Sequence, residues 1–240
     1  MSSTRRRRLI VAIDGPAASG KSTTARAVAD ALGFEHIDSG ALYRAVPLIA
    51  LESPEPPDRW RAEELVARAV ARGVTLARSG AGAGGVLDVM VQGESAGPRL
   101  RGDAVTREVS RVAAMGLVRD FVNRLIRDAT PDGGVVLDGR DIGTAVFPDA
   151  EVKVFLVAHP EERARRRLAE RGRAPDAQDI RVEAEALVRR DDSDASRDVA
   201  PLARAEDAVL LDTTTLSFDE QVRAIVGLVR RKAGSGPLTR

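Results

Sequence analysis

An α/β fold with a parallel sheet flanked by helices is predicted by three features of this 240-residue sequence. Short apolar runs, which are typical of buried strands, alternate with longer stretches that have helical periodicity. The glycine-rich segment GPAASGKS, residues 15–22, separates the first apolar run from the first helical stretch. The hydrophobic content of 43% is enough for a core, and the length fits one domain or a domain with insertions.

The first part of the chain shows this alternation most clearly. LIVAID (9–14) is an expected buried strand, and residues 21–33 form an expected helix that a glycine closes. FEHID (34–38) is the next expected strand, and a helix follows at 39–52, where Pro47 is a candidate kink or break. Strand, glycine loop and helix therefore come in the order that a phosphate-binding loop requires.

The remaining elements follow from the same two patterns. Between residues 60 and 128 the pattern changes, because two strands with a glycine-rich connection lie among helices, so this range reads as an insertion into the parallel sheet. In chain order we expect a helix at 58–73, strands at 74–79 and 85–93, helices at 103–115 and 116–130, strands at 134–139 and 152–158, helices at 160–172 and 179–192, a strand at 207–213 and a helix at 217–232.

The composition argues against several classes of protein. The chain has no cysteine and two histidines, which excludes disulfides and argues against thiolate or histidine metal sites. No apolar run approaches the ~20 residues that span a bilayer, and no signal peptide is recognised. The net charge is +1, and four positive charges lie at 5–8, so the rest of the chain is mildly acidic. We expect a cytoplasmic protein that binds neither membranes nor nucleic acid.

Residues 15–22 match G-x-x-x-x-G-K-[ST], the loop that cradles nucleotide phosphates. Gly15 and Gly20 let backbone N–H groups face the phosphates, and the following helix adds its positive N-terminal end. Lys21 can reach the β- and γ-phosphates, and the Ser22 hydroxyl can bind Mg²⁺. The predicted ATP-binding residues are Gly15, Pro16, Ala17, Ala18, Ser19, Gly20, Lys21, Ser22 and Thr23.

Three further groups of polar residues follow expected strands or lie in a run of mixed charges at the end of an expected helix. They are Asp38, Ser39, Tyr43 and Arg44; then Asp138, Arg140 and Asp141; and then Arg190, Asp194 and Arg197. The first two groups fall where ligands bind in open parallel sheets, and Asp138 can hold Mg²⁺ through water. Phosphoryl transfer needs cations such as these arginines. The alternatives are a salt bridge between Arg140 and Asp141, and a solvated helix face for Arg44 and the third group.

Together these segments resemble the nucleoside monophosphate kinases, and among them the bacterial cytidylate kinases, from about residue 9 to residue 228. The phosphate loop alone is common to many unrelated enzymes, whereas DSGALYR, DGRDIGT and DVAPL together are much more specific. Ser193 is a departure, because relatives often carry arginine at that position. The matching segments are AIDGPAASGKSTTA, IDSGALYRA, TREVSRVAA, LDGRDIGTAVFPDA and RRDDSDASRDVAPL.

The resemblance implies a role for individual residues. Arg44, Arg140 and Arg197 would grip the 5′-phosphate of the phosphate acceptor, and Ser110, Arg119 and Asp141 would face cytosine. Asp194 would bind the ribose hydroxyls, Ser39 would lie beside the acceptor pocket, and Arg190 would lie against the transferred phosphoryl group. The implied catalytic residues are Lys21, Arg140, Arg190 and Arg197, and the implied magnesium ligands are Ser22 and Asp138.

The resemblance also implies a domain organisation. A nucleoside monophosphate kinase-like core would carry an inserted subdomain that binds the acceptor, and a short helical lid. The expected segments are a basic tail at 1–8, the core at 9–59, 129–164 and 191–232, the inserted subdomain at 60–128, the lid at 165–190 and a C-terminal tail at 233–240.

The implied activity is direct transfer of phosphate from ATP to CMP or dCMP. We expect Mg²⁺ to accompany ATP, no tightly bound organic cofactor and a monomeric protein. Two alternatives stay open. One is a kinase for another small acceptor, such as UMP, AMP or shikimate. The other is a nucleotide-gated binding module that phosphorylates nothing, although such a switch would not need phosphate-binding arginines on each side of the sheet.

Overall fold

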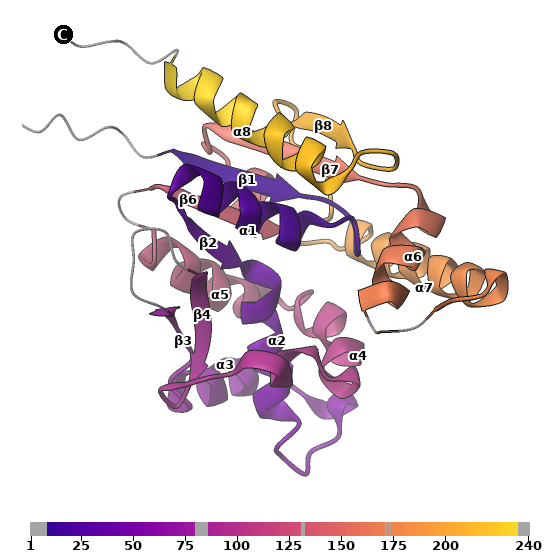
Figure 1. Cartoon of the computed structure of the whole chain (residues 1–240). Helices are drawn as coiled ribbons and strands as arrows, with labels where there is room; N and C mark the ends of the chain where they lie inside the picture. The colour runs from indigo at the N-terminus through magenta and orange to yellow at the C-terminus, as the bar shows by residue number, and fades with distance from the viewer. Residues whose placement is uncertain (1–8, 80–85, 131–132, 171, 173, 235–240) are drawn as a thin grey trace, which may run out of the picture.

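One mostly parallel sheet forms the centre of the molecule (Figure 1). The computed structural model describes residues 9–79, 86–130, 133–170, 172 and 174–234. The strand order is β3-β4-β2-β6-β1-β7-β8, and β5 pairs with β4. The strands are β1 (Ile10–Asp14), β2 (Glu35–Asp38), β3 (Thr75–Ser79), β4 (Val86–Val91), β5 (Glu94–Ser95), β6 (Val135–Gly139), β7 (Val152–Val157) and β8 (Val209–Asp212).

The parallel strands lie at the centre of the sheet: β1 pairs in parallel with β6 and β7, and β2 pairs in parallel with β6. The sheet also continues into the expected insertion: β4 pairs in parallel with β2, and β3 and β5 pair with β4 in antiparallel fashion. The helices are α1 (Lys21–Leu32), α2 (Ser39–Ala50), α3 (Ala62–Ala71), α4 (Asp103–Val112), α5 (Gly116–Asp128), α6 (Pro160–Glu170), α7 (Ala177–Ala195) and α8 (Phe218–Gly234).

Helices cover both faces of this sheet. Alternate residues of β1 point to opposite faces, so Val11 and Ile13 pack with α1 and α8, whereas Ala12 packs in the larger core with α2, α3 and α5. In Figure 1, α1 and α8 lie together across the upper strands, and α2 to α5 lie below. The two cores hold the strand ends in place at the edge where the site forms.

The turn after β1 requires glycine at its first position. Gly15 has φ of 152°, and a Cβ atom there would lie 2.2 Å from the Leu156 carbonyl oxygen in β7. Gly20, in the left-handed region, directly precedes the first residue of α1. The loop between them therefore passes close to the sheet and leads directly into the first turn of α1.

The expected α/β fold is confirmed, and the differences from the expected elements are local. Pro47 does not break α2, which continues to Ala50 while its buried face packs in the larger core. The helix expected at 179–192 runs from Ala177 to Ala195, because Asp176 and Asp179 form a capping box at its start. Beyond those, β5 and a π-helical turn at Ile142–Val146 were not expected.

The boundaries of the expected segments stay predictions. Helix α7 runs continuously past residue 190, where the lid was expected to end. The basic tail at 1–8, the glycine-rich connection at 80–85 and residues 235–240 of the C-terminal tail lie outside the described residues. Within the described residues, no helix combines the length and the apolar character needed to cross a membrane.

Candidate active site

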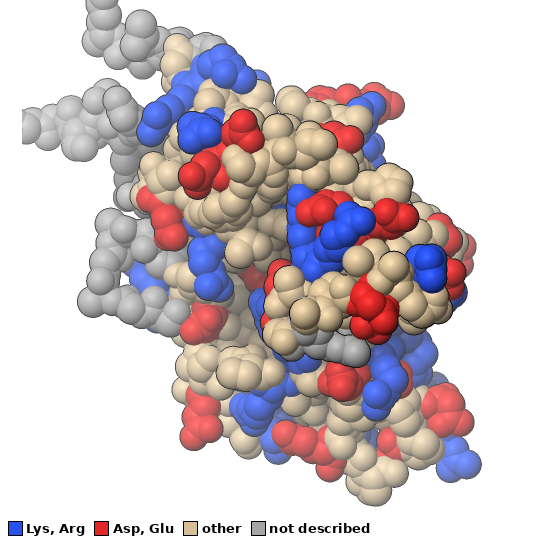
Figure 2. Space-filling view, turned by 45° about the vertical axis from the view of Figure 1, so that its right-hand side comes forward, with Lys and Arg blue, Asp and Glu red and all other residues tan. Residues whose placement is uncertain are grey.

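A cleft of about 560 Å³ opens at the carboxyl ends of β1, β2 and β6. This edge is where ligands bind in open parallel sheets. The face of the molecule in Figure 2 carries charges of both signs, interspersed. The predicted site residues that line the cleft are Ala17, Ala18, Gly20, Lys21, Ser22, Thr23, Ser39, Arg44, Ser110, Arg119, Asp138, Arg140, Asp141, Arg190, Asp194 and Arg197.

The phosphate loop forms one wall of the cleft. Lys21, the first residue of α1, folds back so that Nζ donates to the Pro16 carbonyl oxygen at 2.8 Å. Burial and the positive charge of Arg140 lower the pKa of Lys21 to about 7, and the carboxylate of Asp138 opposes that shift. An anionic phosphate at the loop would reverse this effect, because an opposite charge favours the ammonium form.

Asp138, the second-last residue of β6, stands at the centre of a buried polar group. Its carboxylate accepts a hydrogen bond from the Ser22 hydroxyl, and its Oδ1 lies 2.8 Å from His36 Nε2. Burial raises the pKa of Asp138, but its contacts with His36 and Ser22 outweigh burial and the pKa lies below its usual range. Hard oxygen donors of this kind suit Mg²⁺, so the residues present fit the ion that we expect here from the sequence.

The wall opposite the phosphate loop carries a buried ion pair. Arg119 of α5 pairs with Asp141, and both side chains are at most 5% exposed. Arg119 also donates to the Ala113 carbonyl oxygen at 3.0 Å and lies over the Tyr43 ring, 5.3 Å from its centroid. The alternative of a salt bridge between Arg140 and Asp141 is wrong, because Asp141 pairs with Arg119.

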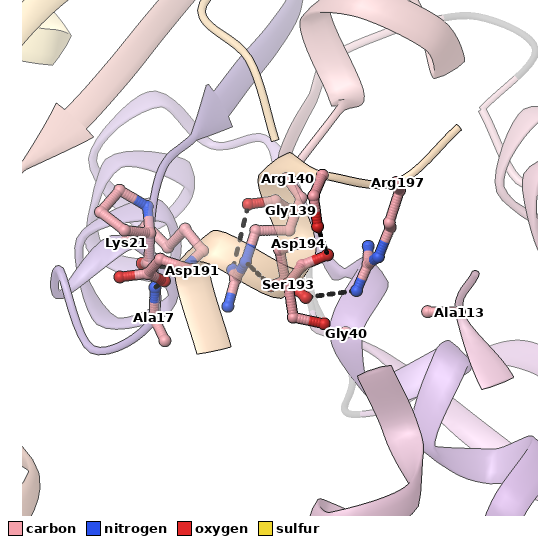
Figure 3. Close-up of polar contacts among 12 residues, drawn as sticks. Ala17, Lys21, Gly40, Ala113, Gly139, Arg140, Asp191, Ser193, Asp194 and Arg197 are labelled. Atoms are coloured by element: carbon pink, nitrogen blue, oxygen red, sulfur yellow. Dashed lines mark hydrogen bonds and ion pairs between the residues drawn. The ribbon is translucent and has the colours of Figure 1, made fainter. Parts of the chain in front are cut away.

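Arginines from four parts of the chain surround the space between these two walls. Arg140 Nε donates to Asp194 at 3.0 Å, and Arg197 pairs with the other oxygen of the same carboxylate (Figure 3). Arg44 donates to the Gly40 carbonyl oxygen at 3.0 Å. Burial and the charges of Arg140 and Arg44 lower the pKa of Arg190 to about 10. A bound anion would reduce the electrostatic repulsion among these buried positive charges.

The solvated-face alternative is wrong for Asp194, which is 2% exposed although its helix neighbour Asp192 is exposed. Arg44, Arg190 and Arg197 each keep a buried Nε that has no hydrogen-bond partner among the described residues. Unpaired buried donors are costly, and these three arginines line one cleft, where a bound ligand could accept hydrogen bonds from them. Because these donors are cationic, that ligand carries negative charge.

Two features of the site were missed in the sequence. Asp191 accepts a hydrogen bond from the Ala17 amide at 2.8 Å and pairs with Arg163, which donates to the Ala17 carbonyl oxygen at 2.9 Å. This contact ties α6 and α7 to the phosphate loop, and Figure 3 shows Asp191 beside Ala17 and Lys21. The second feature is Asp14, the last residue of β1, whose buried carboxylate binds backbone in the Asp141 loop.

A phosphate loop that faces an arginine cluster across one cleft, on a parallel sheet between helices, defines the class of P-loop kinases. The family model described as cytidylate kinase matches residues 11–231. The chain belongs to the cytidylate kinase family.

Curated relatives match over almost the whole chain. A cytidylate kinase of Chlorobaculum tepidum is 44% identical over 93% of this chain and 93% of its own length. Cytidylate kinases of Geobacter sulfurreducens and Geobacillus kaustophilus are 40% and 42% identical, over 99% and 95% of this chain and 99% and 100% of their own lengths. A solved shikimate kinase of Bacteroides thetaiotaomicron, 14% identical, covers 93% of this chain and 97% of its own at a TM-score of 0.46.

Proposed function

We propose that this protein transfers the γ-phosphoryl group of ATP directly to CMP or dCMP and releases ADP with CDP or dCDP. The observation that carries the proposal is the position of the Arg119–Asp141 pair, which lines the same cleft as the phosphate loop. Membership of the cytidylate kinase family supports the choice of acceptor. The reaction needs no covalent intermediate, so the protein contributes positioning and charge stabilisation.

The donor side of the reaction rests on the phosphate loop. Its backbone amides and the N-terminus of α1 hold the phosphates of ATP, and Lys21 neutralises charge on the β- and γ-oxygens. Ser22 and Asp138 would hold Mg²⁺, which would neutralise negative charge at the phosphates when bound. Arg190, which reaches the cleft from α7, stabilises the phosphoryl group in transit.

The acceptor side rests on the opposite wall. The 5′-phosphate of CMP is bound by the planar guanidinium groups of Arg44, Arg140 and Arg197. Ser39 lies beside this phosphate. Asp194 accepts hydrogen bonds from the ribose hydroxyls. The base lies against Ser110 and Arg119, where Asp141 accepts a hydrogen bond from the exocyclic amino group of cytosine. Uracil has an oxygen at that position, so this contact separates the two pyrimidines.

Water is itself a competent phosphate acceptor, so the site has to exclude it. The expected lid at 165–190 and the expected inserted subdomain at 60–128 border the cleft through Arg167 and Ser110. We propose that both close over the nucleotides, as lids do in other phosphate-transfer enzymes. The cytoplasmic location and the monomeric state that we expect from the sequence stay predictions.

The test is a comparison of acceptors under one set of conditions. Release of ADP is measured with ATP and Mg²⁺ in the presence of CMP, dCMP, UMP, AMP or shikimate. We expect fast release with CMP and dCMP and much slower release with the other three. Fast release with UMP, AMP or shikimate alone would support the alternative kinase, and slow release with every acceptor would support the binding module.

Replacing Asp194 by alanine is expected to lower kcat/KM for both acceptors by about 10- to 100-fold, because a hydrogen bond to a charged group is lost. The KM for ATP should stay nearly unchanged. The ratio of kcat/KM for CMP to kcat/KM for dCMP should shift, because CMP offers both the 2′- and the 3′-hydroxyl and dCMP only the 3′-hydroxyl. Steady-state kinetics with each acceptor at saturating ATP measure these constants.

The matched control for this prediction is Asp192→Ala, which removes an exposed carboxylate from the same helix. That variant should keep wild-type constants. Wild-type constants for CMP and dCMP in a folded Asp194→Ala protein would show that Asp194 does not read the ribose.

A further inference from the structure

Asp14 joins the two halves of the cleft without lining it. It is the last residue of β1, directly before the phosphate loop, and is 5% exposed. Its Oδ1 accepts the Ile142 amide at 2.8 Å and its Oδ2 accepts the Gly143 amide at 2.7 Å. Both oxygens of one buried carboxylate therefore bind consecutive amides 128 and 129 residues further along the chain.

The amides that Asp14 binds directly follow Asp141. They belong to the first residues of the π-helical turn Ile142–Val146, whose free N–H groups need acceptors. Asp141 itself has φ of −145° and ψ of 24°, which lies outside the regular helical and extended regions. The turn itself holds the Asp141 carbonyl oxygen, which accepts a hydrogen bond from the Ala145 amide at 2.8 Å. Asp14 holds the two amides that follow Asp141 from outside the turn.

Ionised Asp14 is costly for this fold. The pKa of Asp14 is raised to about 6, chiefly by burial and to a smaller extent by the nearby Asp141, while the two amides and Lys21 oppose that shift. Each of the two amides donates to a different oxygen of Asp14, so a side chain of the same shape with only one acceptor oxygen would leave one amide without its present partner.

We propose that Asp14 is a positioning residue for recognition of the acceptor base: it fixes the turn that presents the Asp141 carboxylate to cytosine. The proposal rests on the proposed function, because it assigns a cause to the CMP preference of that site. Asp14 acts through Asp141 and not on the phosphates. Because β1 leads straight into the phosphate loop, the same residue ties the base-reading turn to the strand that carries the donor loop.

The test uses the full-length protein with Asp14→Asn and Asp14→Ala. Asparagine keeps the shape but leaves one amide without an acceptor, and alanine removes both acceptors. We expect the ratio of kcat/KM for CMP to that for UMP to fall by about 10- to 100-fold in both variants, because misplaced recognition groups cost this much. The KM for ATP should stay close to that of the wild type.

This ratio distinguishes positioning from a purely structural role. A loss of folded protein lowers activity toward CMP and UMP equally, so the ratio measured on one sample is unchanged. Asp149→Asn, which alters an exposed carboxylate in the segment after the turn, is the matched control and should keep the wild-type ratio. An unchanged ratio in both Asp14 variants would overturn the proposal.

A double variant tests the route of the effect. If Asp14 acts through Asp141, the variant with Asp14→Asn and Asp141→Ala should have the ratio of Asp141→Ala alone. If the fold-changes of the two single variants multiply in the double variant, Asp14 does not act through Asp141. Calorimetric dissociation constants for CMP and UMP give the same comparison without turnover. If the wild type had no kinase activity, the proposed function would be wrong. Loss of the CMP preference in the dissociation constants of the Asp14 variants would still support the role proposed for Asp14.

Discussion

Replacing Asp141 by alanine is expected to remove most of the preference for CMP over UMP, a change of about 10⁴-fold in the ratio of their kcat/KM values. The reason is the burial of the Asp141 carboxylate beside Arg119. Arg119 pairs with one oxygen of that carboxylate. An acceptor that offers an oxygen in place of the cytosine amino group leaves the other oxygen without a donor, which a buried site penalises strongly. Steady-state kinetics with both acceptors at saturating ATP measure the ratio.

The control for this variant is Asp120→Ala, because Asp120 is exposed and directly follows Arg119 on α5. It should keep the wild-type ratio. Loss of Asp141 also leaves Arg119 buried without its ion-pair partner, so absolute rates will fall for both acceptors. If the ratio of kcat/KM for CMP to kcat/KM for UMP stays at the wild-type value, Asp141 does not distinguish the two bases.

Replacing Lys21 by alanine is expected to lower kcat by about 10² to 10³ while the protein stays folded. The ammonium group of Lys21 lies within the phosphate loop and is poised to move from the Pro16 carbonyl oxygen to a phosphate. Its charge is most useful when charge develops on the transferred group, so kcat should fall more than KM for CMP rises. Turnover at saturating ATP and CMP, with a thermal melt of each protein, measures both effects.

Lys232→Ala, which removes an exposed lysine near the end of α8, is the control and should leave turnover unchanged. Near-normal turnover by a folded Lys21→Ala protein would contradict the assignment of residues 15–22 to the nucleotide phosphates.

The parts of the fold that could be predicted from sequence are those with local causes. The phosphate loop requires glycines, lysine and serine at fixed spacing between a strand and a helix, and Gly15 indeed turns where a Cβ atom would meet β7. Strand and helix types followed from hydrophobic periodicity. Pro47 shows the limit of such rules, because packing of α2 in the larger core maintains a helix that local propensity argues against.

The parts that could not be predicted depend on contacts distant in sequence. Asp191 and Ala17 are 174 residues apart, and Asp14 and Ile142 are 128 apart, so no spacing rule connects them. Burial of Asp194 was missed for a related reason. A run of mixed charges is typical of a solvated face, and only the position of α7 against Arg140 and Arg197 removes that carboxylate from water.

We expect direct transfer of the phosphoryl group from ATP to a cytidine monophosphate within one cleft. The most direct test uses ATP labelled at its γ-phosphorus, incubated with the protein, Mg²⁺ and CMP. The label should then appear in CDP, with little labelled inorganic phosphate and no labelled protein. Label that stays covalently on the protein, or is released as inorganic phosphate at a rate independent of CMP, would contradict it.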